Sequence, residues 1–137
     1  MSRSGYTDDC PMDNSGWLYR GAVKSAIQGR RGQAFLNEML RALDAMPEQK
    51  LIAHELEKDG AVCAIGAVGK ARSLDMSKLD PEDAYILAET FGIAPALARE
   101  LVFENDDDFG FRAREAPEAR FQRMRTWIVE NIKRGTL

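Results

Sequence analysis

Short amphipathic segments separated by glycine and proline restrict the fold of this chain more than any other feature. From Trp17 to Gln28, and again from Phe35 to Leu43, apolar residues recur every three or four positions, which is the spacing of one helix face. Gly29-Arg30-Arg31-Gly32 marks a break between the two segments, and we expect them to pack as a helical hairpin. The apolar positions are Leu18, Ala22, Val23, Ala26, Ile27, Phe35, Leu36, Met39, Leu40 and Leu43.

Three further helices are predicted to begin near prolines. Asp80-Pro81 places an Asp N-cap before a proline at the first helical position, and Gly92 ends that helix. Pro95 opens the next helix, which runs into the acidic segment 105–108. We expect that segment to be a solvated loop, because carboxylates at a helix C-terminus oppose the helix dipole. Pro117 starts the last helix, whose predicted buried stripe is Phe121, Met124, Ile128 and Ile132.

The middle of the chain has two interpretations. Pro47-Glu48 is a helix-start signal and Gly60 a stop signal, which favours a helix over residues 47–60. Asp59-Gly60 between two apolar runs also fits the turn of a β-hairpin near residues 51–66. The following segment, 61–74, consists largely of small residues, so a helix there would approach a neighbouring backbone closely. That neighbour lies in the same chain or in a second copy, and the sequence leaves the oligomeric state open.

Length and composition fit a single domain. A chain of 137 residues with 45% apolar and 30% charged residues has the profile of one globular domain. Residues 1–16 lack apolar periodicity and are rich in turn formers, so we predict a flexible N-terminal arm followed by one domain over residues 17–137. The expected fold is predominantly α, a compact bundle-like domain of about six or seven short helices, with the β-hairpin as the alternative near residues 51–66.

The sequence also restricts location and cofactors. No apolar run approaches the roughly 18 residues that cross a bilayer, and no signal-peptide core is present at the N-terminus. We therefore expect a cytoplasmic protein without membrane contact. Cys10 and Cys63 have no metal-binding spacing and His54 is the single histidine, so we predict reduced thiols, no zinc site and no cofactor.

Charge is divided unevenly along the chain. Residues 1–50 carry seven Lys/Arg and six Asp/Glu, residues 51–108 five and thirteen, and residues 109–137 seven and three. Because surfaces of one sign steer encounters with partners, this division indicates docking surfaces; the alternative is that the charges only solvate helix faces. Our acidic candidates for protein interaction are Glu104, Asp106, Asp107 and Asp108. Our basic candidates for nucleic acid or another anionic partner are Arg20, Lys24, Arg30, Arg31, Arg120 and Arg123.

The acidic run raises the question of calcium. With Glu104 as the first ligand, Asp106, Asp108 and Glu115 take the third, fifth and twelfth positions of an EF-hand-like loop. The sixth position, which requires glycine for a sharp turn, is Phe109. We therefore predict no metal.

A helix-turn-helix over residues 84–103 is an alternative source of nucleic-acid binding. With Ala84 at the first position of the motif, small, turn and core residues fall where the motif needs them, including Gly92 at the turn. The positions that would face bases include Arg99 beside Glu100, which is a poor set for reading base edges. The motif is thus degenerate, and a helical hairpin that only packs is the simpler interpretation.

Cys63 and His54 are the candidates for catalysis. A thiolate paired with an imidazole is a nucleophile, Asp106 would orient the ring, and Cys63 lies near the start of a predicted helix, where a thiolate is favoured. A single cysteine in an Ala/Gly-rich stretch is more often a small core residue. No Walker lysine or GxGxxG motif indicates a nucleotide enzyme. A non-enzymatic role is therefore our first expectation, and a thiol-dependent enzyme using Cys63 is an alternative.

The runs over residues 29–72 and 91–106, within a match covering about residues 17–132, resemble small proteins encoded by bacteriophages and prophages. Gly60 to Ala67 and Asn105-Asp106 are the most recognisable elements. The resemblance implies a phage or prophage accessory protein that acts in the cytoplasm of a bacterial host cell, and it transfers no site residue. Such proteins regulate, inhibit or adapt larger assemblies, including host defence systems such as CRISPR complexes. We therefore expect a non-enzymatic protein that binds a host or phage assembly, with a nucleic-acid-binding regulator as the alternative.

Overall fold

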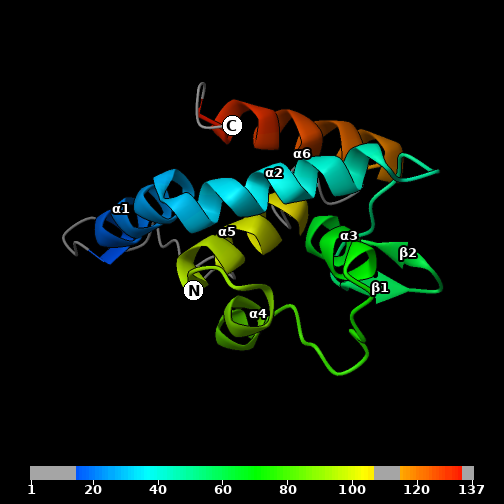
Figure 1. The fold of residues 1–137 in the computed structure, drawn as a ribbon, viewed down its shortest axis with the longest axis horizontal. Coiled ribbons are helices and arrows are strands. Elements are labelled where there is room, and N and C mark those ends of the chain that lie inside the picture. Colours follow the sequence, from blue (N-terminus) through cyan, green and yellow to red (C-terminus); the bar gives the residue numbers. More distant parts are fainter. Residues whose placement is uncertain (1–14, 107–114, 134–137) are drawn as a thin grey trace.

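The computed structural model describes residues 15–106 and 115–133 (Figure 1). Six helices and one two-stranded antiparallel hairpin form this part of the chain, which confirms a predominantly α domain and the hairpin alternative. The elements in chain order are α1 (Ser15–Gln28), α2 (Arg30–Asp44), β1 (Glu57–Lys58), β2 (Ala61–Val62), α3 (Ala64–Ala71), α4 (Ala84–Phe91), α5 (Pro95–Asp106) and α6 (Pro117–Asn131).

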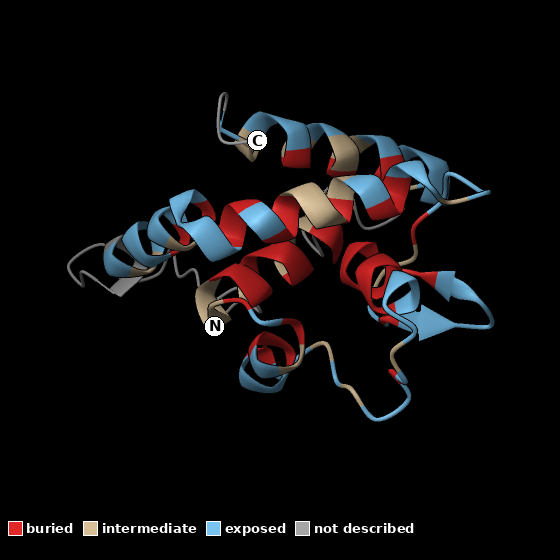
Figure 2. Cartoon of the chain, in the orientation of Figure 1, coloured by how far each residue is buried: buried red, intermediate tan, exposed pale blue. Residues whose placement is uncertain are grey.

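Helix α5 lies at the centre of the domain. It contacts α1, α3, α4 and α6, and seven of its twelve residues are buried while the other five are half-buried. Figure 2 shows the buried residues gathered on α5, α3 and the facing side of α2, while α1 is mostly exposed. The largest fully buried side chains are Leu36, Met39, Leu43, Leu51, Ile65, Val68, Leu87, Leu97, Leu101, Phe121, Met124 and Ile128.

Helices α1 and α2 form a bend instead of the expected hairpin. Only Gly29 separates them, which is too short for the loop of an antiparallel pair, and α2 continues roughly where α1 ends (Figure 1). The predicted break is therefore confined to Gly29, and Gly32 lies inside α2. A Cβ at Gly32 would overlap the carbonyl oxygen of Ala26, so glycine permits the close approach of the two helices.

The bend is also tied to the end of α6. The buried side chain of Gln33 donates to the carbonyl oxygens of Ile27, at 2.7 Å, and Asn131, at 3.0 Å. Its own oxygen accepts a hydrogen bond from the backbone N–H of Lys133 at 2.8 Å. One amide side chain thus holds the ends of α1 and α6 together.

The helix favoured over residues 47–60 is wrong. The backbone of this segment forms hydrogen bonds with residues outside it: the N–H of Leu51 donates to the Pro117 carbonyl, and the N–H of Ile52 donates to the Val62 carbonyl. His54 and Asp59 have positive φ angles of 72° and 53°, which a helix excludes. Instead, β1 pairs with β2 through the registers Glu57↔Val62 and Lys58↔Ala61.

The close approach expected for the small-residue segment is confirmed in α3. A Cβ at Gly66 would overlap the backbone carbonyl of Leu56, and one at Gly69 would overlap the sulfur of Met76. Only glycine lets α3 lie this close to the segment before the hairpin. The packing partner is in the same chain.

Helix α4 begins later than expected. Its N-cap is Asp83, whose side chain accepts from the N–H of Ile86 at 3.1 Å, while Asp80 caps a separate turn by accepting from Glu82 at 2.8 Å. Gly92 ends α4 in a left-handed conformation, with φ of 75°, as glycine at that position allows. Among the described residues, no helix has the length and apolar character needed to cross a membrane.

Candidate functional site

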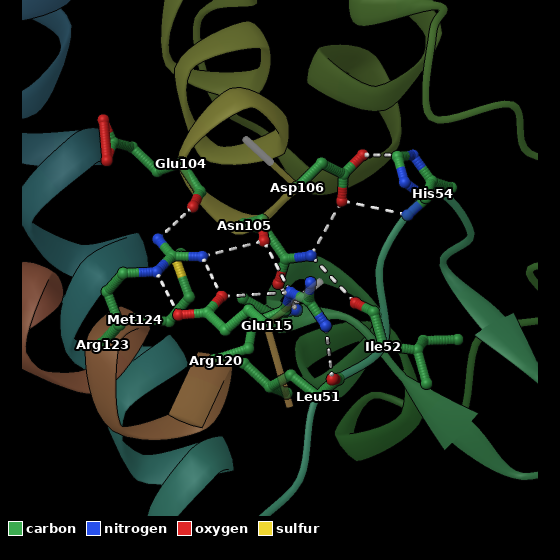
Figure 3. A network of polar contacts seen from close by, with 11 residues as sticks. Leu51, Ile52, His54, Glu104, Asn105, Asp106, Glu115, Arg120, Arg123 and Met124 are labelled. Atoms are coloured by element: carbon green, nitrogen blue, oxygen red, sulfur yellow. Dashed lines mark hydrogen bonds and ion pairs between the residues drawn. The ribbon is translucent and has the colours of Figure 1, made fainter. Parts of the chain in front are cut away.

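A buried polar network joins α5, α6 and the segment before the hairpin (Figure 3). Asn105, which is 2% exposed, lies at its centre. The side-chain oxygen of Asn105 accepts from the Ala64 N–H at 3.0 Å, and its amide donates to the Ile52 carbonyl at 2.9 Å. Residues from two distant parts of the chain are thereby fixed to the last turn of α5.

Two arginines of α6 complete this network. Arg120, which is 5% exposed, donates to the backbone oxygens of Asn105, at 3.0 Å, and Leu51, at 3.3 Å. Arg123 forms a two-pronged ion pair with Glu115, at 2.8 and 2.9 Å, and donates to the backbone oxygens of Glu104 and Asn105. These guanidinium groups satisfy the last carbonyls of α5, which have no partner inside the helix.

Asp106 also belongs to the interior. Its side chain is 4% exposed and accepts hydrogen bonds from the backbone N–H of His54, at 3.0 Å, and from the Asn105 amide, at 2.9 Å. The second carboxylate oxygen lies 3.7 Å from Nδ1 of the exposed His54 ring. The two residues are thus brought together as the catalytic hypothesis requires, but Asp106 holds the backbone turn at His54 in position.

Cys63 is the N-cap of α3. Its sulfur accepts from the N–H of Gly66 at 3.3 Å, and the residue is buried. Burial raises the pKa of the Cys63 thiol to about 12, so the thiol stays protonated at neutral pH, contrary to the expected thiolate. A protonated, buried sulfur is unsuited to nucleophilic attack, and the described residues contain no group of three or more His, Cys, Asp or Glu that would hold a metal.

Of the four residues of the predicted acidic surface, the structure describes Glu104 and Asp106, and neither is fully exposed. Asp106 is buried, which corrects the expectation of a solvated loop: α5 continues through Asp106 because α6 arginines cover its final carbonyls. Glu104 is half-buried, and its backbone oxygen accepts a hydrogen bond from the Arg123 guanidinium. Asp107 and Asp108 lie outside the described residues, as do most positions of the calcium loop considered above.

The basic candidates fall into two groups. Arg120 and Arg123 are structural and contact Glu115. Arg20, Lys24, Arg30 and Arg31 are exposed on α1 and the first turn of α2, and we call this second group the basic bend. Among the described residues, no carboxylate lies within ion-pair distance of Lys24, Arg30 or Arg31, so their charge faces solvent.

The residues of the degenerate helix-turn-helix do form two packed helices joined by a short turn. The second of them is α5, which other helices cover on several sides. A recognition helix must present its side chains to the major groove, whereas seven residues of α5 are buried and the other five are half-buried. Arg99, the one cation proposed to face bases, is stacked on Tyr85, with 5.3 Å from the guanidinium carbon to the ring centre.

A groove that the sequence did not predict lies between the end of α2, α3 and the hairpin. It has a volume of about 690 Å³. Val62 and Ala67 in its wall are buried, Met46 and Ile52 are half-buried, and exposed charged residues stand at its edge. The cluster of small residues around positions 60–71 was the available signal, because small side chains leave room for a concave surface. The charged edge residues are Glu48, Lys50, Asp59 and Lys70.

Comparisons of this chain with protein-family models, with curated proteins and with solved structures found no match.

Proposed function

We propose that this chain is a non-enzymatic accessory protein of phage or prophage type that binds another protein in the bacterial cytoplasm. The groove between α2, α3 and the hairpin carries the proposal. Its occupant is an extended segment of the partner that inserts apolar side chains. Inhibition of a host defence assembly such as a CRISPR complex is one form that this binding would take.

The anatomy of the groove resembles that of a protein interface. Such interfaces combine an apolar centre with a polar rim, as do the walls formed by Met46, Val62 and Ala67 and the charged edge with Lys50 and Asp59. The rim carries both signs of charge, which suits a polypeptide better than a polyanion. The groove is also open on one side, whereas small-molecule sites bury most of the ligand surface.

Hydrogen bonds connect the walls of the groove, which lowers the entropy lost on binding. The Ile52 N–H donates to the Val62 carbonyl at 2.9 Å, and the Lys70 ammonium donates to the Gly60 carbonyl at 2.9 Å. Lys70 thus connects the hairpin turn to α3. Because the Gly60 carbonyl is neutral, this contact does not neutralise the positive charge of Lys70. An acidic residue of the partner, next to its apolar side chains, would therefore form an ion pair with Lys70.

The test begins with affinity capture of the tagged protein from nuclease-treated bacterial lysate, followed by mass spectrometry. The captured partner is then purified and titrated against wild-type protein and the double variant Ala61→Glu/Ala71→Glu. Both alanines are exposed and line the groove, so the new side chains fill it without entering the core. We expect binding to weaken by more than about tenfold, equivalent to 1.4 kcal/mol. Ala34→Glu, at an exposed position on α2, is the matched control and should bind normally.

If the double variant binds the partner as tightly as wild type, the groove is not the docking site. If nuclease treatment removes everything that the wild-type protein captures, the proposal of a protein partner is wrong. Far-UV circular dichroism of each variant establishes that the helices are intact in either case.

A further inference from the structure

We propose that the basic bend is a second docking surface, and that it binds the phosphate backbone of nucleic acid. This proposal does not depend on the groove. In Figure 1 the bend lies toward the opposite end of the molecule from the hairpin, so the two surfaces have no residue in common.

The bend has a single sign of charge over a long stretch. Between Asn14 and Asn37 the chain contains four Lys/Arg and no Asp/Glu. The end of α6 adds a fifth cation, because the Lys133 ammonium donates to the Gln28 carbonyl at 2.8 Å. Polyanions bind where several cations lie close together, since each one neutralises a phosphate and releases a counterion.

Several other arginines of the described chain are instead bound to carboxylates. Arg72 is bound to Glu38 at 2.6 Å, and Arg125 to Asp44 at 2.7 Å. Arg123 is bound to Glu115 at 2.8 Å. Arg30 and Arg31 have no such carboxylate among the described residues, so an external anion would not displace an internal partner.

The shape of the bend fits a phosphate backbone. Gly21, Ala22 and Ser25 are exposed beside the cations, and a Cβ at Gly21 would meet no atom within 4 Å. Side chains this small cannot cover the longer cationic ones beside them. Three of the four cations of the bend are arginines, whose planar guanidinium groups bind phosphate oxygens in pairs. Nucleic acid therefore fits this surface better than an acidic protein, whose binding would call for an apolar centre.

Fluorescence anisotropy with a labelled DNA duplex and a labelled single-stranded RNA tests the proposal and separates the two sources of phosphate. With three or four phosphate contacts, we expect affinity for the DNA duplex to fall roughly 40- to 150-fold between about 50 and 200 mM salt. In Lys24→Ala/Arg30→Ala/Arg31→Ala, the slope of log affinity for the duplex against log salt should become less steep by about 2.7. The matched control is Arg41→Ala/Lys58→Ala/Lys78→Ala, which removes the same charge from exposed positions elsewhere and should retain most of the binding.

The proposal is overturned if neither probe binds at low salt, or if the control variant weakens binding as much as the bend variant. Equal competition by polyglutamate and by unlabelled DNA would assign the surface to an acidic protein instead. The groove variant Ala61→Glu/Ala71→Glu should bind nucleic acid like wild type, so failure of one proposal leaves the other intact.

Discussion

The junction of α5 and α6 and the bend of α1 and α2 are both rich in arginine, yet the fold uses them in opposite ways. At the junction, Arg120 and Arg123 are turned inward and bind carbonyl oxygens and Glu115. At the bend, Arg30 and Arg31 face solvent. The comparison shows that a basic segment exposes its charge to solvent only where its side chains reach neither the carbonyl oxygens of a helix end nor a buried carboxylate.

Replacing a junction arginine should give the largest effect on stability. Arg120→Met leaves the carbonyl oxygens of Asn105 and Leu51 buried without their donor, and we expect a loss of about 3–5 kcal/mol. Denaturant unfolding followed by circular dichroism measures this loss. Arg125→Met on the same helix removes an exposed ion pair with Asp44 and should cost no more than about 1 kcal/mol. Similar losses in the two variants would contradict the structural role assigned to Arg120.

An intermediate case is the ion pair of Arg72 with Glu38, which joins α3 to α2 at the edge of the core. Hydrogen bonds from the Arg72 guanidinium hold the pKa of the Glu38 carboxyl below its ordinary value of 4.5. A lowered pKa stabilises the folded state above the ordinary value, and this contribution is lost as pH falls through the folded value. Wild type should therefore exceed Glu38→Gln in stability near pH 7, and the difference should shrink as the pH falls below the ordinary pKa of the Glu38 carboxyl.

The measurement for this pair is the denaturant midpoint of both proteins across that pH range. Glu130→Gln, which removes the same charge from an exposed position on α6, is the control. A gap between wild type and Glu38→Gln that stays constant with pH would show that the ion pair does not contribute through its charge.

The bend should give the smallest effect on stability. Lys24→Ala/Arg30→Ala/Arg31→Ala removes exposed side chains, each expected to change the free energy of unfolding by less than about 0.5 kcal/mol. The measurement is the same denaturant titration as for Arg120→Met. A large loss would mean that these cations stabilise the bend itself, and the contrast with the α5–α6 junction would disappear.

Local signals predicted those elements whose ends are set by neighbouring residues. Pro117 starts α6, Gly92 ends α4, and the apolar stripe of α2 is buried except for Leu40, which is half-buried. On α1, Leu18 and Ala22 are exposed, Leu18 to 67%, because only one side of this outer helix meets the core. The sequence also placed Asp106 beside His54, although as the group that orients a catalytic imidazole and not as part of a structural turn.

Periodicity, helix caps and the spacing of small residues were enough to determine by themselves a predominantly α chain and a close approach at Gly66, since these depend on residues near in sequence. Only the tertiary structure decided that Leu51 and Ile52 are not helical, because the hydrogen-bond partners of their backbones lie far along the chain. It also decided which arginines are interior. A guanidinium group is the same in Arg120 and Arg30, and what differs is whether the folded chain brings an oxygen to it.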